Sequence, residues 1–309
     1  MRIHTQKSVS LFIGHWIQAI RPFAFTASII PVTLGAVFAF AGPYPIRWEL
    51  FPLVLVCALF FHAGTNLVND YYDFTRGIDT LDSFGSSRIL PEHKLTPRQI
   101  HRSALFCFGC GFGLGIILVI IHGLPMLGLG MIGLLGGYFY TARPVEYKYR
   151  ALGDIFVFIL MGPLMVIGSF FALTGTYHPG IFYVSLPIGF LVTAILHANN
   201  LRDIDHDRQA RIKTFANMLG HRNAQIEYLI LIGGAYLSVL ILIISRTISL
   251  WGILVFLSVP VALKNIMAIE KSKPHTPQDL AAIDKETAKL HFLFGALMIV
   301  SFYLETIIT

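Results

Sequence analysis

Apolar runs of about 20 residues recur along this chain and constrain its fold more than any other feature. A helix of that length spans the roughly 30 Å hydrocarbon layer of a bilayer. Hydrophobic residues make up 55% of the chain and charged residues only 13%, whereas soluble domains are roughly 25% charged. The sequence therefore predicts an all-α integral membrane protein with nine transmembrane helices in a bundle, at about 23–42, 50–69, 103–121, 124–142, 152–174, 180–200, 224–245, 248–268 and 288–308.

Basic residues are distributed unevenly between the two sides of this predicted topology. Short cytoplasmic loops collect Lys and Arg. If the N-terminus is cytoplasmic, all of the 23 Lys and Arg residues except Arg47 and Arg246 fall in cytoplasmic segments. We therefore expect the N-terminus and the acidic loops in the cytoplasm and the C-terminus on the opposite side. The net charge of +6 is then a topology signal, and no nucleic-acid partner is expected.

The first 22 residues are predicted to be an interfacial helix that precedes a single transmembrane domain at 23–309. Apolar side chains recur there with helical spacing, at Val9, Phe12, Ile13, Trp16, Ile17 and Ile20. A frayed tail is the alternative. No signal peptide is expected, because polar residues such as His4 and Gln18 interrupt the stretch and no small-residue cleavage site follows.

Two acidic segments lie at the cytoplasmic ends of the second and sixth predicted helices. A carboxylate at membrane depth is costly, so both segments are candidates for function. If the helices continue, each segment places three residues on one helix face. The first face has Asn66, Asp70 and Asp73, at i, i+4 and i+7. The second has Asn200, Asp203 and Asp207, at i, i+3 and i+7.

Two facing sets of Asn and Asp oxygens predict a site for a hard cation. Oxygen ligands without Cys, and without closely spaced His pairs, favour Mg²⁺ over Zn²⁺. Mg²⁺ is commonly shared with substrate phosphates, so we also expect a phosphate-bearing ligand. The expected metal ligands are Asn66, Asp70, Asp73, Asn200, Asp203 and Asp207. The alternative is a pair of solvated helix ends neutralised by nearby arginines.

Basic residues near these segments would stabilise the charge that develops on a departing diphosphate. The candidates are Arg76, Arg143, Lys148 and Arg202, although each also fits an ordinary cytoplasmic anchor. His62 and His197 lie one turn before the two segments. They are either lining residues of an acceptor pocket or packed, hydrogen-bonded histidines.

These segments resemble the two Asp-rich motifs of the UbiA superfamily of intramembrane prenyltransferases. Here the motifs read NLVNDYYDFTRGID at 66–79 and NNLRDIDHD at 199–207. Three further stretches fall in the expected order, at 19–36, 138–154 and 286–295. The second motif and the stretch KYRALGD at 148–154 are similar to the menaquinone branch, which includes 1,4-dihydroxy-2-naphthoate polyprenyltransferases and the animal menadiol-prenylating enzyme. Phe74 after Asp73 departs from the NDxxDRxxD motif of 4-hydroxybenzoate prenyltransferases.

The resemblance implies transfer of a polyprenyl group from an allylic diphosphate to an aromatic acceptor, most closely 1,4-dihydroxy-2-naphthoate with loss of CO₂. It implies two Mg²⁺ ions, a lipid-facing portal for the prenyl tail and a cytoplasmic cap of short loop helices. No obligatory protein partner is expected. The implied catalytic residues are Asp70, Asp73, Lys148, Asp203 and Asp207. The implied substrate-binding residues are Asn66, Asn69, Arg76, Asp79, Tyr140, Arg143, Asn200 and Arg202.

Other functions stay open at this point. A cation-coupled transporter would also use acid-bearing helices, but its ion site should lie near the bilayer midplane. Prenylation of another aromatic or a tetrapyrrole acceptor is a second alternative.

Two loops, at 79–102 and 205–222, are expected to form the cap and to close over the diphosphate, with Gly85-Ser86-Ser87 as a mobile part. Thr96 and Pro97 predict a helix start, and Thr214 and Gly220 bracket a short helical pattern.

Overall fold

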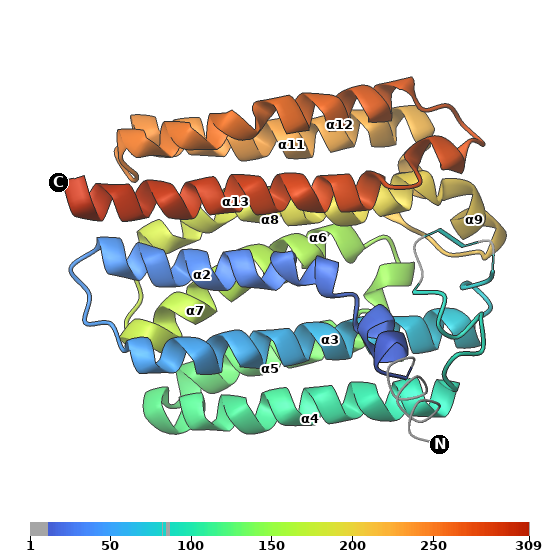
Figure 1. The fold of residues 1–309 in the computed structure, drawn as a ribbon, viewed down its shortest axis with the longest axis horizontal. Helices are drawn as coiled ribbons and strands as arrows, with labels where there is room; N and C mark the ends of the chain where they lie inside the picture. Colours follow the sequence, from blue (N-terminus) through green and yellow to red (C-terminus); the bar gives the residue numbers. More distant parts are fainter. Residues whose placement is uncertain (1–11, 82, 85–86, 309) are drawn as a thin grey trace, which may run out of the picture.

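Long helices run side by side along one axis in the computed structural model (Figure 1). The structure describes residues 12–81, 83, 84 and 87–308, and these contain no strand. Residues 12–20 are helical. The longer helices are α2 (Thr26–Ala41), α3 (Phe51–Thr75), α4 (Pro97–His122), α5 (Leu124–Phe139), α8 (Pro179–Arg202), α11 (His221–Ile244), α12 (Val259–Lys271) and α13 (Ile283–Ile308). The shorter α-helices are α6 (Gly153–Ile159), α7 (Met165–Thr174), α9 (Ile204–Gln209) and α10 (Phe215–Leu219).

Single-turn and irregular helices connect these elements. The 3₁₀ helices are η1 (Pro22–Phe25), η2 (Trp48–Leu50), η3 (Tyr147–Tyr149), η5 (Leu250–Ser258) and η6 (Pro277–Leu280). A π-helical turn, η4 (Leu160–Leu164), joins α6 to α7 and contains Pro163. Proline has no backbone N–H to donate within a helix, so a local change of helical type is expected at this point.

Eight helical segments of the described chain are long and apolar enough to cross a membrane. They are Phe12–Ala41, Trp48–Thr75, Pro97–His122, Gly153–Thr174, Pro179–Arg202, His221–Ile244, Leu250–Lys271 and Pro277–Ile308. Each corresponds to one predicted span. The ninth predicted span, 124–142, forms α5, which is apolar but has only 16 residues and a length of about 24 Å.

The boundary predicted near residue 22 falls at a break in the first of these segments. Arg21 has a positive φ of 54° and separates the helical residues 12–20 from η1 and α2. Val9, which was predicted to share the apolar face of the N-terminal helix, lies outside the described residues. The assignment of this segment to the membrane interface stays a prediction.

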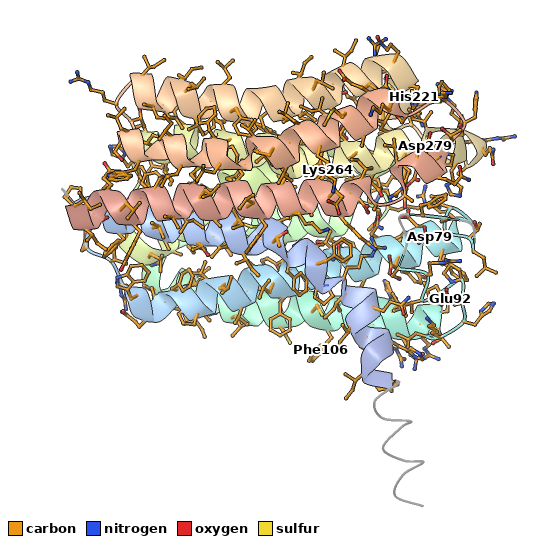
Figure 2. The ribbon with its side chains drawn as sticks, turned by 45° about the horizontal axis from the view of Figure 1, so that its top comes forward. Asp79, Glu92, Phe106, His221, Lys264 and Asp279 are labelled. Carbon is orange, nitrogen blue, oxygen red and sulfur yellow. The ribbon has the colours of Figure 1, made fainter. Side chains whose placement is uncertain are left out.

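Exposed apolar side chains cover the length of the bundle, as expected for a surface in contact with lipid. Phe106 on α4 is 68% exposed, and Ile120 on the same helix is 79% exposed. Figure 2 shows Phe106 on the outer side of the bundle, whereas Asp79, Glu92 and Asp279 lie toward one end. The chain is therefore an integral, multi-pass membrane protein. Which end faces the cytoplasm stays a prediction.

The connections that follow α3, α5, α8 and α12 gather at the end of the bundle where α9 lies. The C-terminus, which follows α13, lies at the opposite end (Figure 1). Two predicted helix starts in these connections are confirmed. Thr96 caps α4 in a capping box with Gln99, and Thr214 caps α10 in the same way with Asn217. Gly85 and Ser86, the first two of the three residues of the predicted mobile stretch, lie outside the described residues.

Candidate active site

The two acidic segments meet at this loop-bearing end of the bundle, where they line one cavity of about 430 Å³. The C-terminal part of α3 and the residues that follow it contribute Asn66, Asn69, Asp73 and Asp79. The end of α8 and the start of α9 contribute Asn199, Asn200, Asp203 and Asp207. The structure thus brings together two segments that are more than 100 residues apart in the sequence.

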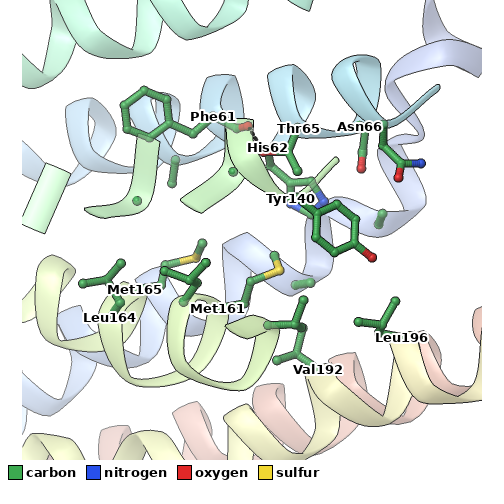
Figure 3. Close-up of a pocket in the computed structure, with 18 of the residues that line it drawn as sticks. Phe61, His62, Thr65, Asn66, Tyr140, Met161, Leu164, Met165, Val192 and Leu196 are labelled. Carbon is green, nitrogen blue, oxygen red and sulfur yellow. Dashed lines mark hydrogen bonds between the residues drawn. The ribbon is translucent and has the colours of Figure 1, made fainter. Parts of the chain in front are cut away.

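The cavity is polar at this end and apolar along the rest of its length. In Figure 3, Asn66 and Tyr140 lie toward one end of the view, and Leu164 and Met165 lie toward the other. The apolar wall comes from α4, α5, η4 and α7, and includes Ile116, Leu129 and Met161. Such a cavity can hold a ligand with a charged head and a long hydrocarbon tail.

Asp73 is fixed at the polar end by two donors from the loop after α5. Lys148 Nζ donates to Asp73 Oδ2 at 2.5 Å and to Asn69 Oδ1 at 2.8 Å. The Tyr149 hydroxyl donates to Asp73 Oδ1 at 2.6 Å. Burial lowers the pKa of Lys148, but the charge and hydrogen bond of Asp73 outweigh burial, and the pKa lies above its ordinary value. Lys148 is therefore a cation in the cavity wall.

Asp70 does not line the cavity but holds a cation that does. Its carboxylate forms an ion pair with Arg21 and accepts a hydrogen bond from the Ser87 hydroxyl. Arg21 lines the cavity beside the first acidic segment. In the sequence Arg21 is one of many basic residues predicted to be cytoplasmic, and the Arg21-Pro22 step before the first span is its only local signal.

The second acidic segment has its own buried cation, Arg202. Its side chain is fully buried and bonds Asp203 through Nε and Nη2, each at 2.8 Å, with Asp284 3.4 Å away. Arg202 itself does not line the cavity, whereas Asp203 does. The structure therefore places Arg202 as a partner of Asp203 behind the wall.

The other predicted residues divide between the cavity and its surroundings. Tyr140 lines the cavity, and Lys148 Nζ is 5.7 Å from the centre of its ring. Arg76 pairs with Glu146 and lies over the Tyr149 ring, outside the lining. The Arg143 side chain is 79% exposed, and the structure does not bring it to the cavity.

Of the two candidate histidines, one lines the cavity and the other does not. His62 lines the cavity, and its Nδ1 is 2.7 Å from the Ser28 hydroxyl. His197 does not reach the cavity and is fully buried beside Asp154. Asp154 was not singled out, although it ends the KYRALGD stretch.

Negative charge exceeds positive charge in the lining of the described cavity. Five aspartates line it, against the two cations Arg21 and Lys148: Asp73, Asp79, Asp203, Asp207 and Asp284. Burial, followed by the charges of Asp73 and Asp70, raises the pKa of Asp79 to about 8. Burial and the charge of Asp203 raise the pKa of Asp207 to about 7. An added cation with oxygen ligands would neutralise this excess.

Comparison with known sequences gives one family across most of the chain. The model of the UbiA prenyltransferase family matches residues 28–296. The 1,4-dihydroxy-2-naphthoate octaprenyltransferase of Bacillus subtilis is 34% identical over 281 residues, which cover 91% of this chain and 89% of that protein. Human UbiA prenyltransferase domain-containing protein 1 is 33% identical over 293 residues, which cover 94% and 83% of the two chains.

Solved structures share the fold at low sequence identity. The apo structure of a UbiA homolog from Aeropyrum pernix K1 has a TM-score of 0.66 at 16% identity, covering 93% of this chain and 98% of that one. A UbiA homolog from Archaeoglobus fulgidus bound to DMAPP and Mg²⁺ has a TM-score of 0.59 at 18% identity, covering 92% and 99%.

Proposed function

The chain belongs to the UbiA prenyltransferase family, and from this premise we propose that it transfers a polyprenyl group from an allylic diphosphate to 1,4-dihydroxy-2-naphthoate, with Mg²⁺ and with loss of CO₂. The observation that carries this proposal is the cavity, which has an acidic, oxygen-rich end and an apolar remainder. Family membership favours a prenyltransferase over a cation-coupled transporter. The Bacillus subtilis relative supports the choice of acceptor, since its name specifies the dihydroxynaphthoate.

The lining residues fit Mg²⁺, because carboxylate and amide oxygens dominate the polar end and carry excess negative charge. Five of the six expected ligands line the cavity and would hold the ions: Asn66, Asp73, Asn200, Asp203 and Asp207. Bound Mg²⁺ supplies positive charge that stabilises the diphosphate as it leaves. Asp70 contributes indirectly here, by fixing the guanidinium of Arg21.

The chain's own cations and apolar wall perform the remaining tasks. Lys148 and Arg21 face the polar end, where they would bind diphosphate oxygens as the allylic C–O bond breaks and its electron pair leaves with the diphosphate. The apolar wall keeps water from the resulting allylic cation. The ring of Tyr140 presents a π face beside the polar end, and such a face attracts positive charge.

The acceptor completes the balance of the reaction. Its carboxyl-bearing ring carbon forms the new carbon–carbon bond with the allylic cation. CO₂ then leaves, and the electrons of its bond return to the ring and restore aromaticity. The products are therefore a prenylated naphthalenediol, diphosphate and CO₂.

The test uses purified protein in nanodiscs with an allylic polyprenyl diphosphate and a panel of acceptors. We expect diphosphate release and a prenylated product with 1,4-dihydroxy-2-naphthoate, loss of both with a chelator, and recovery with Mg²⁺ but little with Zn²⁺. Turnover with only 4-hydroxybenzoate or a tetrapyrrole precursor would refute the acceptor. Failure to release diphosphate with any allylic donor would refute the reaction, and cation flux in liposomes without such turnover would identify a transporter.

A further inference from the structure

A buried polar cluster lies behind the second acidic segment, outside the lining of the cavity. It consists of Asp154 on α6, His197 on α8 and Glu227 on α11, whose ligand atoms lie within 4.8 Å of one another. The side chains of His197, Asp154 and Glu227 are 0%, 6% and 17% exposed. Polar groups at this depth are costly unless they are hydrogen-bonded.

The hydrogen bonds of His197 connect Asp154 on α6 to the backbone of α11. Nδ1 lies 2.8 Å from Asp154 Oδ2, and Nε2 lies 2.8 Å from the carbonyl oxygen of Ala224. A carbonyl oxygen only accepts, so Nε2 carries a hydrogen. Nδ1 is hydrogen-bonded to Asp154 whether the proton between them lies on the ring or on the carboxylate. Both ring nitrogens are therefore engaged by groups of the protein.

Asp154 connects this cluster to the cavity. Its second oxygen, Oδ1, accepts a hydrogen bond from Asn200 Nδ2 at 3.2 Å. Asn200 is 5% exposed and lines the polar end of the cavity, whereas Asp154 does not. The amide NH₂ of Asn200 is thus bound behind the wall, and its carbonyl oxygen is left for the cavity.

This choice of amide orientation matters because the two ends of an asparagine side chain have opposite roles. The carbonyl oxygen is a cation ligand, and the NH₂ group is a donor that cannot bind a cation. Asp154 accepts from Asn200 in either protonation state, so it favours the orientation that presents oxygen. His197 in turn holds Asp154 through its other oxygen, as outer partners of metal ligands commonly do.

The first acidic segment uses the same device with a different partner. Asn66 Nδ2 donates to the backbone carbonyl oxygen of Ile20 at 3.0 Å. Asn66 also lines the cavity. In both segments, therefore, an acceptor outside the cavity binds the amide hydrogens of the asparagine.

Close helix packing brings Asp154 within reach of α8. The continuation of α6 in η4 contains Gly162, where an added Cβ would lie 2.5 Å from the Cα of Gly189 on α8. Side chains at this crossing would separate the two helices. This close contact between η4 and α8 brings the stretch KYRALGD, which ends at Asp154, next to the second acidic segment, which contains Asn200.

We propose that Asp154 and His197 are positioning residues, which hold the Asn200 side chain with its carbonyl oxygen toward the cation–diphosphate site. The inference rests on the proposed function, because it assigns a purpose to the orientation of an expected ligand. It adds residues that touch neither the cation nor the substrate, and it explains why two separate sequence features meet.

The test measures metal binding directly, with Mn²⁺ as the probe and electron paramagnetic resonance as the readout, in the presence of a non-hydrolysable prenyl diphosphate analogue. Asp154→Leu removes the acceptor and should weaken Mn²⁺ binding about 10-fold or more. Asp154→Asn should bind about as well as the wild type, because the introduced carbonyl still accepts from Asn200 and the introduced NH₂ donates to His197 Nδ1. Equal weakening in both variants would overturn the proposal, since it would mean that the charge of Asp154 matters and its hydrogen bond does not.

A reciprocal exchange keeps the test valid if Asp154→Leu does not fold. In the double variant Asp154→Asn/Asn200→Asp, the introduced amide donates to the introduced carboxylate, whose second oxygen faces the cavity, and the introduced carbonyl accepts from Nδ1 of a protonated His197. It should bind Mn²⁺ at least as tightly as the wild type, whereas Asn200→Asp alone places two carboxylates in contact and should bind more weakly. A folded double variant that is no better than Asn200→Asp alone would overturn the proposal.

Tyr228→Phe on α11 is the matched control for lost buried hydrogen bonding. The fully buried Tyr228 hydroxyl is 2.8 Å from Thr287 Oγ1, away from the cavity lining. This variant should unfold at a lower temperature and bind Mn²⁺ as the wild type does. A wild type that neither binds Mn²⁺ nor releases diphosphate would refute the proposed function. A wild type that does both, with unaltered binding in folded Asp154→Leu, would refute only the positioning role.

Discussion

Substitution of Lys148 is the most direct test of how the cavity would stabilise a leaving diphosphate. The Lys148 ammonium is the cation that the first acidic segment holds in the wall, through Asp73 at 2.5 Å and Asn69 at 2.8 Å. Lys148→Met keeps most of the side-chain length and removes the charge. The side chain is only 15% exposed, so solvent would not replace the lost donor fully.

The expected loss can be estimated from the number and kind of contacts removed. One preorganised donor to a developing anion is worth about 10² to 10³ in kcat, or about 2.7–4 kcal/mol. Asp73 keeps the Tyr149 hydroxyl at 2.6 Å, so the variant should still fold. In Lys148→Met, however, the Asp73 carboxylate faces an incoming diphosphate without the ammonium of Lys148 between them. We therefore expect kcat/KM for the allylic diphosphate to fall about 10²- to 10³-fold.

Steady-state and single-turnover measurements at saturating Mg²⁺ would separate this effect from weakened metal binding. Lys264→Met is the matched control, because the Lys264 side chain is 72% exposed and its partner Glu286 lies 3.5 Å away, outside the cavity. It should leave kcat/KM unchanged. A loss in Lys148→Met smaller than about 10-fold, which corresponds to about 1.4 kcal/mol, in a folded protein would refute the role given to Lys148.

Three further predictions concern the charges around the cavity. Asp73→Asn and Asp207→Asn should each abolish turnover, because both charges are needed when Mg²⁺ and diphosphate are bound; Asp207→Asn should change the unfolding temperature little, whereas Asp73→Asn should lower it, because it leaves the buried ammonium of Lys148 with a weaker partner; near-normal activity at ordinary Mg²⁺ would contradict a site shared by both segments. Arg143→Gln should leave kcat/KM close to the wild type, since the Arg143 side chain is 79% exposed, whereas Arg21→Gln should lower it at least about 10-fold; similar losses in both would argue against this division. The affinity for Mg²⁺ should rise with pH from about 6 to about 9, because the pKa values of Asp207 and Asp79 are raised to about 7 and about 8 and each group adds a negative charge to the cavity when it loses its proton. Calorimetric titrations of Mg²⁺ in buffers of different ionisation enthalpy would measure the proton release, and a pH-independent affinity would contradict the predicted rise. The same raised pKa values mean that, without metal, these groups contribute less to the free energy of unfolding as the pH rises from about 4 to about 8.

The helices could be predicted because the length and polarity of a membrane-spanning helix are encoded locally. The run at 124–142 shows the limit of this reasoning. It is apolar to its end, yet α5 stops at Phe139, and the backbone N–H of Lys148 bonds the carbonyl oxygen of Tyr140 in the turn that follows. Hydropathy records which residues suit lipid, but it does not record where the chain leaves the helix for the following turn.

Spacing along a helix predicted the face of the first acidic segment, on α3, but not the direction of each side chain. The second segment does not lie on one continuous helix as predicted, because α8 ends at Arg202 and α9 begins at Ile204. Asp70 and Asp73 are three residues apart, which separates them by about 60° around the helix axis. That difference is enough for Asp73 to line the cavity while Asp70 binds Arg21, 49 residues earlier in the chain. Asp154 is similarly 46 residues from Asn200. Contacts between such distant residues depend on helix packing, which no local spacing reveals.

In the proposed reaction, the change from a polar to an apolar wall along the cavity would give diphosphate and the prenylated product different exits. Diphosphate is soluble only in water and must leave by the loop-bearing end. The proposed prenylated diol carries neither the diphosphate nor the carboxylate, so the acidic end would no longer retain it. Its partition into the surrounding hydrocarbon would then control its departure. Enzyme assayed in small detergent micelles should therefore accumulate product and slow sooner than the same enzyme in an extended bilayer, where the product is diluted into lipid.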